Sequence, residues 1–387
     1  MSALESAEWL TGHSVAEDIA QLASLGVPVK EGWADGSRLL DSLLLSRLVD
    51  ENDVSYELEN KLLSFTNAQP WKHKTKEWVG KDKDAGQAPP ALLAERCRYD
   101  AWASYVIAAH YRKQLASKLP LVEFTHRIAS VLGRVSLAGA IVDLETFEQM
   151  GRSLESTLLS TKDQLTKLSV AQGMESFCPT NDDNIRSLLY SHLGLPVLAR
   201  TAKENLPSVA KPTLKQLDHE AVKILLAFNA ADKQYSVNFL GLNAILHRCG
   251  NIEGSPVAWL PFRINPLGAK TGRRASSNPN SQNWPPQVRK IIRSRWKNGA
   301  IADIDYRKLE AVLIGWVAKD DKLFTFFNEG AGYIDVASEL LGTKVEEGTP
   351  KYKAIKSIVL GVHYNKQTPN MARDLWSLRI RFSVDYN

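Results

Sequence analysis

Apolar residues recur at helical spacing through much of the first two-thirds of this chain. Residues 1 to about 118 mix helical patterns with short apolar stretches. A charged segment at 71–90 interrupts them and predicts a solvated loop, after which a helix starts near Ala91. The stretches from 119 to about 200 and from 211 to 239 predict a helical arm, whose apolar stripe includes Leu154, Leu158, Leu159, Leu165 and Leu168.

The pattern changes after Cys249. Gly, Pro and Asn become frequent through residues 250–287. The sequence AIADID at 300–305 then predicts a brief buried strand that ends in a carboxylate, and helices are predicted at about 308–319 and 350–364. The second part of the chain is therefore expected to differ in architecture from the helical arm.

Composition is that of an ordinary globular protein. The chain has 387 residues, of which 44% are hydrophobic and 24% charged, enough for about two or three domains. No apolar run approaches the length of a membrane span, and the first ten residues carry two glutamates where a secretory signal would be positive. The three cysteines form no CxxC pair, so we expect reduced, buried thiols rather than disulfides or a zinc site.

Positive charge is concentrated in one window. Between Gly254 and Ala302 there are nine Lys and Arg residues and no Asp or Glu, with Ser, Asn and Gln between them. This composition is typical of a surface that follows a phosphate backbone and offers amide and hydroxyl groups to sugars or bases. A solvated basic face is the alternative explanation of the charge alone.

A motif lies inside this window. Residues 271–285, TGRRASSNPNSQNWP, resemble the TGRxSSxxPNxQNxP signature of family A DNA polymerases, which lies in the palm beside the primer-template duplex. Side-chain amides can donate to the minor-groove acceptors that every base pair presents, which suits an enzyme that binds any sequence. The resemblance implies DNA contacts from Thr271, Arg273, Asn280, Gln282, Asn283 and Arg289.

A second motif follows about 30 residues later. The sequence DYRKLE at 305–310 resembles the family motif DYSQIELR. The resemblance implies that Asp305 is a catalytic metal ligand, that Tyr306 belongs to the nucleotide site, and that Glu310 blocks the space of a ribose 2′-hydroxyl. Considered alone, an Asp before a helix and a Glu in its first turn are also typical of capping.

A third motif covers the predicted helix at 353–364, KAIKSIVLGVHY, which resembles the fingers helix RxxxKxxxFGxxYG. By that resemblance Lys356 meets the incoming triphosphate, Leu360 packs against its base or sugar, and Tyr364 lies at the template end. Lys353 is included in the nucleotide site, and Tyr352 stands where the family has an arginine. The alternative is a core helix with a lysine that reaches solvent.

Two further matches lie near the start of the chain. GHSVAED at 12–18 and RCRYD at 96–100 resemble the second and third motifs of a 3′–5′ proofreading exonuclease, and they imply that Asp18 and Asp100 are catalytic metal ligands. Arg96 stands where the family usually has a tyrosine, and no DxE motif precedes residue 18. The pair at Asp143 and Glu145 lies after Asp100, in a stretch that resembles the link into the thumb, so it is rejected. A surface Asp is the alternative for each match.

The resemblance covers nearly the whole chain and implies a multidomain α/β and α+β fold. We expect a partial ribonuclease H-like exonuclease domain at 1–118, thumb and connecting helices at 119–250, the first part of the palm at 251–310, and incomplete fingers at 311–387. The family's third polymerase motif has no counterpart before Asn387. We therefore expect a chain of phage or bacterial type, truncated or split at both ends and inactive alone.

The implied activity is DNA-templated DNA synthesis in replication. This nucleotidyltransferase would add deoxynucleotides to a primer 3′ end with two Mg²⁺ ions, next to a vestigial or partial proofreading exonuclease. Its partners would be primer-template DNA and deoxynucleoside triphosphates, and a second chain is one way to supply the rest of the palm. No membrane partner is expected, and the expected location is the cytoplasm of a bacterium or a phage-infected cell.

Two alternatives remain open. The chain could be a non-catalytic DNA-binding subunit of a split polymerase, which primer extension with and without a partner chain would distinguish. It could also be a related single-chain RNA polymerase. The exonuclease-like start and Glu310 disfavour the latter, and ribonucleotide incorporation would decide it.

Overall fold

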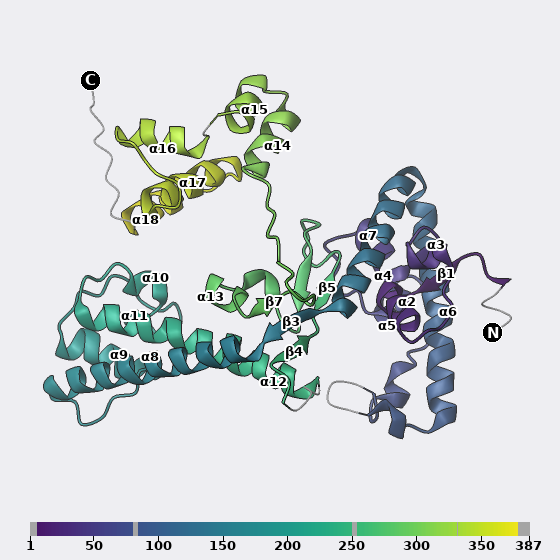
Figure 1. Ribbon diagram of the computed structural model, residues 1–387, viewed down its shortest axis with the longest axis horizontal. Coiled ribbons are helices and arrows are strands. Elements are labelled where there is room, and N and C mark those ends of the chain that lie inside the picture. The colour runs from purple at the N-terminus through teal and green to yellow at the C-terminus, as the bar shows by residue number, and fades with distance from the viewer. Residues whose placement is uncertain (1–5, 80–83, 250–253, 331, 378–387) are drawn as a thin grey trace. The chain divides into compact units, whose positions relative to one another are not determined.

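The computed structural model describes residues 6–79, 84–249, 254–330 and 332–377 (Figure 1). The chain divides into two compact units, Met1–Ser156 with Asp232–Ala300 and Thr157–Ala231 with Ile301–Asn387. Each unit is thus built from two separate stretches of sequence, and the four predicted domain ranges stay a prediction. None of the described helices is both long enough and apolar enough to cross a membrane.

The first unit begins with residues 6–138, called here the N-terminal module. Its strand β1 (Leu10–Gly12) pairs in parallel with β2 (Leu39–Asp41). Parallel neighbours need a crossover connection, which two helices provide. The helices of the module are α2 (Val15–Ser24), α3 (Glu31–Ala34), α4 (Ser42–Val49), α5 (Leu58–Leu63), α6 (Pro90–Gln114) and α7 (Leu119–Ala138).

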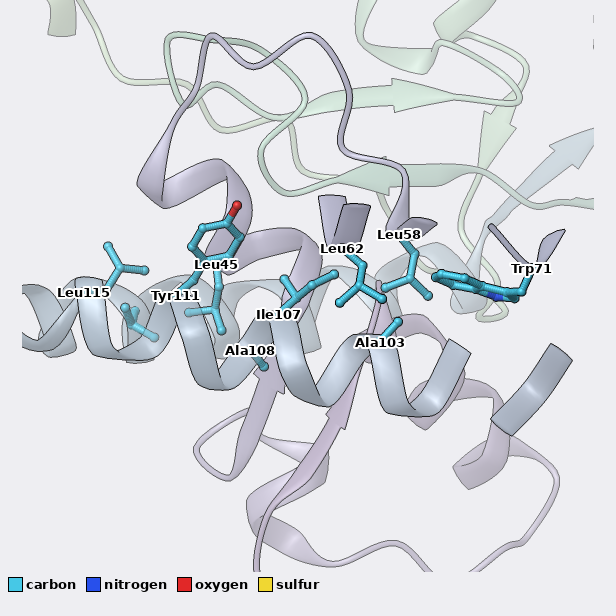
Figure 2. Close-up of a cluster of buried hydrophobic side chains, with 10 residues drawn as sticks. Leu45, Leu58, Leu62, Trp71, Ala103, Ile107, Ala108, Tyr111 and Leu115 are labelled. Atoms are coloured by element: carbon cyan, nitrogen blue, oxygen red, sulfur yellow. The ribbon is translucent and has the colours of Figure 1, made fainter. Parts of the chain in front are cut away.

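Helix α6 buries one side against α4 and α5 (Figure 2). Ile107 of α6 contributes to a cluster with Leu45 and Leu62, and all three side chains are fully buried. The helix begins with Pro90, whose fixed φ suits a first turn and whose missing N–H has no helical partner there. The predicted start near Ala91 is therefore confirmed.

The charged segment before α6 is less solvated than predicted. Trp71 and Thr75 are buried, and Trp71 belongs to the same cluster as Ile107 (Figure 2). The indole N–H of Trp71 donates to Asp100 over 2.8 Å, and its backbone N–H donates to Glu59 over 2.6 Å. The solvated-loop prediction is wrong at Trp71 because a large ring with satisfied polar groups gains by burial, whatever the charge of its sequence neighbours.

The rest of the first unit contains a small antiparallel sheet. Strand β3 (Ala140–Asp143) lies between β4 (Val257–Leu260) and β7 (Ile292–Arg293) (Figure 1). Val142, Leu260 and Ile291 are fully buried in the core under this sheet. The remaining elements of this part are β5 (Arg263–Asn265), β6 (Ala275–Ser277), α12 (Gly241–Arg248) and α13 (Pro286–Arg289).

The helical arm predicted from the leucine pattern is confirmed in part. Leu165, Leu214 and Leu225 are buried in one core of the second unit, but Leu159 is 63% exposed and residues 119–138 form α7 of the first unit. Its long helix α8 (Leu144–Ala171) starts in the first unit. The other helices are α9 (Asp182–Arg186), a π-helical turn at Ser187–His192, α10 (Lys211–Leu214) and α11 (Glu220–Lys233). The π-helical turn at Gln234–Leu240 that follows α11 belongs to the first unit.

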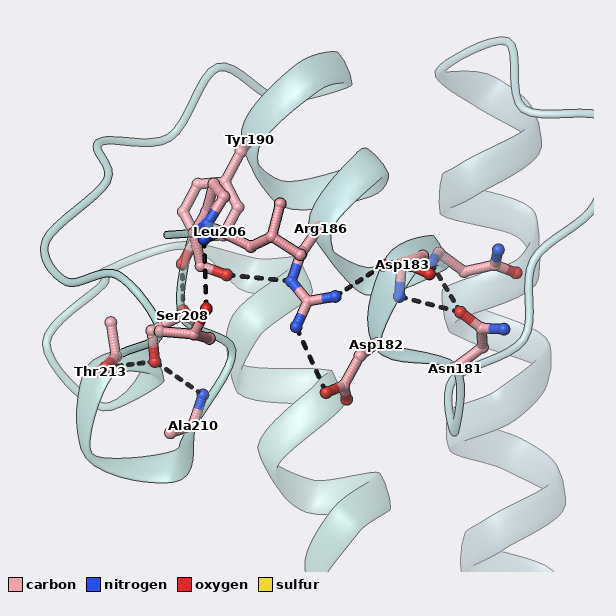
Figure 3. A network of polar contacts seen from close by, with 12 residues as sticks. Asn181, Asp182, Asp183, Arg186, Tyr190, Leu206, Ser208, Ala210 and Thr213 are labelled. Atoms are coloured by element: carbon pink, nitrogen blue, oxygen red, sulfur yellow. Dashed lines mark hydrogen bonds and ion pairs between the residues drawn. The ribbon is translucent and has the colours of Figure 1, made fainter. Parts of the chain in front are cut away.

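A polar network fixes the loop at residues 194–210 on this arm (Figure 3). Arg186 donates from Nε to the carbonyl of Pro207 at 3.1 Å and pairs with Asp183 at 2.6 Å. Tyr190 donates its hydroxyl to the carbonyl of Ser208 at 2.6 Å. Because the Arg186 side chain is only 17% exposed, its hydrogen bonds are partly protected from water.

The described residues of the second unit's later stretch form five α-helices. Tyr333 is the largest of its fully buried side chains and packs with Phe327 and Tyr352. The predicted helices at 308–319 and 350–364 are confirmed with small shifts at their ends. The five are α14 (Leu309–Ala318), α15 (Asp321–Asn328), α16 (Tyr333–Leu341), α17 (Pro350–His363) and α18 (Thr368–Ser377).

Two further predictions about local structure are wrong. Residues 301–305 form no strand, and Ile301 and Ile304 are 56% and 90% exposed. A strand exists only where a neighbour pairs with it, and none of the described residues pairs with this stretch. The cysteines are free as predicted, but Cys97 and Cys178 are exposed rather than buried.

Candidate nucleic-acid and nucleotide site

The predicted DNA-binding motif begins on a β-hairpin, called here the basic hairpin (residues 263–277). Strands β5 and β6 pair antiparallel from Arg263 opposite Ser277 to Asn265 opposite Ala275. In its loop, the N–H of Gly272 donates to Ala269 at 3.0 Å. Gly272 has a φ of 75°, a conformation that disfavours any side chain, so the motif's glycine sets the shape of the loop.

The loop exposes the predicted DNA-binding residues Thr271 and Arg273. The turn after the hairpin is organised by Ser276, which is buried. Its Oγ accepts from the N–H of Gln282 at 3.1 Å and lies 3.2 Å from Oδ1 of Asn280. The side chains of Asn280, Gln282 and Asn283 are exposed, so the turn presents three amides to solvent.

The motif ends at a buried tryptophan. Trp284 is 8% exposed and packs with Val288 of α13. The predicted DNA contact Arg289 donates from Nε to the carbonyl of Trp284 at 3.1 Å and is itself exposed. This bond orients the Arg289 side chain relative to the motif.

Not every cation of the acid-free window is available to a phosphate backbone. Arg263 pairs with Glu17 at 2.9 Å and Arg293 with Asp143 at 3.1 Å. Arg295 donates to the carbonyls of Ala138 and Gly139. The charges along the sequence did not reveal these pairings, because each partner lies far away in the sequence. Exposed cations of the window outside these pairs include Lys270, Arg274, Lys290 and Lys297.

Four of the residues predicted for the nucleotide site lie along α17 or directly after it, in the second unit. Lys353, Lys356 and Tyr364 are exposed, whereas Leu360 is partly buried against the core. Tyr352, at the position of the family's arginine, is buried, and its hydroxyl donates to Glu347 at 3.3 Å. The helix therefore presents Lys356 and Tyr364 to solvent and keeps Tyr352 in the core.

Tyr333 lies beside this helix and was not included in the sequence motifs. Nζ of Lys356 lies 5.5 Å from the ring centroid of Tyr333, a cation–π distance. Burial, followed by the charge of Glu310, raises the pKa of Tyr333 to about 12, so its hydroxyl stays protonated at neutral pH. Tyr333 lies outside all three sequence motifs, so they gave no signal for it.

Asp305 lies in the exposed stretch before α14, with Tyr306 79% exposed beside it. The chain then turns at Lys308, which has a φ of 55° and donates from Nζ to the carbonyl of Gly330 at 2.5 Å. Burial lowers the pKa of Lys308. Glu310 occupies the first turn of α14.

The carboxylates predicted for the exonuclease have different surroundings. Asp18 is exposed on α2, and its pKa is raised by partial desolvation and by the charge of Glu17. Asp100 accepts from the Trp71 indole and pairs with Arg96, with Oδ2 3.5 Å from Nε. Among the described residues, no group of three His, Cys, Asp or Glu side chains is placed to hold a metal ion.

The chain is similar in sequence to known proteins. The sequence profile of DNA polymerase family A matches residues 144–380. The thermostable DNA polymerase I of Thermus thermophilus is 24% identical over 77% of this chain and 34% of its own length. DNA polymerase I of Pseudomonas aeruginosa is 25% identical over 94% of this chain and 40% of its own length. The chain thus spans between a third and two-fifths of these relatives.

A solved structure has a similar fold. The polymerase domain of Pol1 from M. smegmatis, in complex with primer-template DNA and a deoxynucleoside triphosphate, matches with a TM-score of 0.68 and 19% identity. The match covers 96% of this chain and 62% of that one. The helix-rich mixed α/β fold is therefore that of a polymerase domain of this family.

Proposed function

This chain belongs to DNA polymerase family A, and from that premise we propose that it binds primer-template DNA and a deoxynucleoside triphosphate for DNA-templated DNA synthesis. The observation that carries the proposal is the side of α17 where Lys356 and Tyr364 are exposed beside the buried ring of Tyr333. The family profile includes this helix, and the three motifs predicted the same activity.

The basic hairpin is proposed to hold the duplex without reading its sequence. Cations such as Arg273 contact phosphates, and the exposed amides of Asn280 and Gln282 meet acceptors common to all base pairs. Contacts to phosphate fix the register of a protein on DNA but carry no sequence information. This division of roles suits a polymerase.

The side chains of α17 are proposed to hold the incoming nucleotide. Lys356 neutralises charge on the triphosphate that grows during phosphoryl transfer, and Leu360 packs against the base or sugar. Glu310, near enough to influence Tyr333, is proposed to exclude a ribose 2′-hydroxyl.

The described residues do not by themselves make a magnesium site. Asp305 offers one carboxylate, the donor that Mg²⁺ prefers, but no group of three potential ligands exists around it in the part of the chain that is described. We propose that Asp305 is one ligand and that a further segment or a second chain supplies the others.

Primer extension tests the proposal. The chain is mixed with a polypeptide that carries the remaining palm of a family A polymerase, primer-template DNA, Mg²⁺ and deoxynucleotides, and the product is measured on a gel. We expect extension that is lost in Asp305→Ala, with much weaker use of ribonucleotides. Extension that survives Asp305→Ala would reject the assignment of the site.

A non-catalytic DNA-binding subunit is the second candidate, favoured by the absence of a metal-binding group among the described residues. The contacts of Asp100 with Trp71 and Arg96 likewise favour a structural role for the N-terminal module over proofreading. DNA binding without extension in any mixture would support this candidate. We propose a cytoplasmic location in a bacterium or a phage-infected cell, where DNA and deoxynucleotides are both present.

A further inference from the structure

We propose that the N-terminal module positions the basic hairpin for DNA binding, with Glu17, Arg47 and Ser136 as the positioning residues. The inference rests on the proposed function, because it concerns how the DNA-binding hairpin is held. All the residues involved belong to the first compact unit. Three helices of the module, α2, α4 and α7, each contribute one of the three residues.

The first anchor is at the base of the hairpin. Nε of Arg263 lies 2.9 Å from Oε1 of Glu17, and Nη2 of Arg263 donates to Oγ of Ser14 at 3.4 Å. The next residue, Ile264, donates its N–H to Oγ of Ser136 at 3.1 Å. Side chain and backbone of β5 are thus held by two different helices of the module.

The second anchor lies further along the hairpin, at Leu267. Arg47 donates from Nη1 to the carbonyl of Leu267 at 2.8 Å, and its guanidinium carbon lies 4.2 Å from the ring centroid of Tyr56. Stacking on an aromatic ring limits the orientations of the guanidinium. The side chain of Leu267 packs against Ala16, Leu44 and Ala129 of the module.

The helices that carry the anchors are fixed to one another. Asp41 accepts from the N–H groups of Ser14 and Val15 at the start of α2, both at 2.9 Å. The same carboxylate accepts from Leu43 at the start of α4, also at 2.9 Å. A Cβ on Gly133 would lie 2.8 Å from the carbonyl of Ala16, so this glycine permits the close approach of α2 and α7.

Side chains do not completely fill the space between the N-terminal module and the basic hairpin. A cavity of about 210 Å³ remains there, lined among others by Glu17, Asp41, Arg263 and Asn265. Because a loosely filled interface is less able to set a unique position by shape, the polar anchors fix the hairpin. The loop with Thr271 and Arg273 then reaches DNA in a preset orientation, which lowers the entropy cost of binding.

Two explanations of the ion pair between Glu17 and Arg263 predict opposite changes in DNA affinity when Glu17 is replaced. If Arg263 contacted DNA directly, Glu17→Gln would free a cation and strengthen binding. If the pair positions the hairpin, the same variant weakens binding. A partly exposed pair contributes about 0.2–1 kcal/mol, so the expected loss is roughly 1.5- to 5-fold in affinity.

The experiment measures the affinity of the full chain for a random-sequence primer-template by fluorescence anisotropy over a range of salt. Glu17→Gln is compared with Glu31→Gln, an exposed acid of α3 that removes the same charge from the same module. We expect weaker binding for Glu17→Gln only. Equal or tighter binding by Glu17→Gln would overturn the inference.

Two further variants keep the test decisive if one of them folds poorly. Arg47→Lys conserves charge but loses the planar fork, so binding should weaken without a change in salt dependence. The exchanged pair Glu17→Arg with Arg263→Glu should restore wild-type affinity, whereas each single change should not. Failure of the exchange to restore binding counts against positioning. Absence of salt-dependent DNA binding by the wild type would instead reject the proposed function.

Discussion

The backbone N–H of Asp41 donates to Nε2 of His126 at 2.8 Å, and Nδ1 of the same ring lies 2.7 Å from the carbonyl of Val122. The carbonyl can only accept, so Nδ1 carries the proton and Nε2 is the acceptor. His126 is 1% exposed. Asp41, which caps both α2 and α4, is thus held by a neutral histidine. The geometry of the module therefore depends on the protonation state of His126.

Acid should therefore destabilise the module. Burial lowers the pKa of His126 below its ordinary value of 6.5, and it lowers that of His13 as well. The unfolded chain then binds protons first, so the free energy of unfolding falls as the pH drops below about 6.5 and is unaffected above it. Each histidine contributes at most about 1.4 kcal/mol per pH unit.

Urea unfolding at pH 7.5 and pH 5.5 measures this effect. His126→Gln keeps an oxygen that can accept from Asp41 but cannot be protonated, so the variant should lose less stability than wild type between the two pH values. His73→Gln, at an exposed position of the 3-10 helix Lys72–Thr75, is the matched control and should follow wild type. A His126→Gln curve parallel to that of wild type would contradict the prediction.

Lys356 should affect the rate of nucleotide addition and not the affinity for duplex DNA. In any form of the polymerase that extends primers, Lys356→Ala should slow nucleotide addition roughly a hundredfold, because one charge-assisted contact to the transferring phosphate contributes about 3 kcal/mol. DNA affinity should hardly change. Lys351→Ala removes the same charge from the first turn of α17 and should leave the rate near that of wild type. Equal losses of DNA affinity and rate would place Lys356 on the duplex.

Much of the local structure was predictable from the sequence. The family predicted from the three motifs is confirmed by the profile match, and α6, α14 and α17 lie where periodicity and proline predicted them. Helix ends are encoded locally: Thr349 accepts from the N–H of Tyr352 at 3.2 Å, immediately before Pro350. The roles of individual site residues stay predictions.

What could not be predicted depends on contacts between distant residues. Strand β3 lies inside a stretch whose sequence pattern appeared wholly helical. The strand could not be predicted from that pattern, because its partner β4 is more than a hundred residues away. The pairing of Arg263 with Glu17 is equally remote, so a basic window gave no sign that one of its cations is engaged. Conversely, residues 301–305 have a strand-like pattern and no partner among the described residues.

Salt dependence distinguishes the cations of the window that meet phosphates from those held in ion pairs with Glu17 and Asp143. We expect log K for random-sequence DNA to fall with log salt, with a slope on the order of −4 to −5 if about five cations meet phosphates. Arg273→Ala should weaken all sequences alike and make the slope shallower by about 0.9. Arg293→Ala should change the slope much less, because Arg293 is paired with Asp143. A slope of zero for wild type would rule out the basic hairpin as a phosphate-binding surface.

Alkali should destabilise the second unit through Tyr333. Its pKa is raised to about 12, so the unfolded chain loses this proton near pH 10 while the folded chain retains it. The free energy of unfolding therefore falls as the pH rises through 10, and Tyr333→Phe should lose less stability than wild type between pH 8.5 and 10.5, by about 1 kcal/mol, as measured by urea unfolding. Equal losses of stability in the two proteins would contradict the raised pKa of Tyr333.

Arg186 should control the order of the loop at 194–210 (Figure 3). Its guanidinium joins the loop carbonyl of Pro207 to Asp183 on α9, and hydrogen bonds to a charged, partly buried group are worth about 1.5–3 kcal/mol. Arg186→Ala should therefore speed hydrogen exchange at the Leu206 and Ser208 amides, which donate to Thr201 and Ala199. Arg152→Ala breaks an exposed pair with Glu148 and should leave this exchange unchanged. If the loop amides of Arg186→Ala exchanged at the wild-type rate, the bond from Tyr190 to Ser208 would be sufficient to hold the loop.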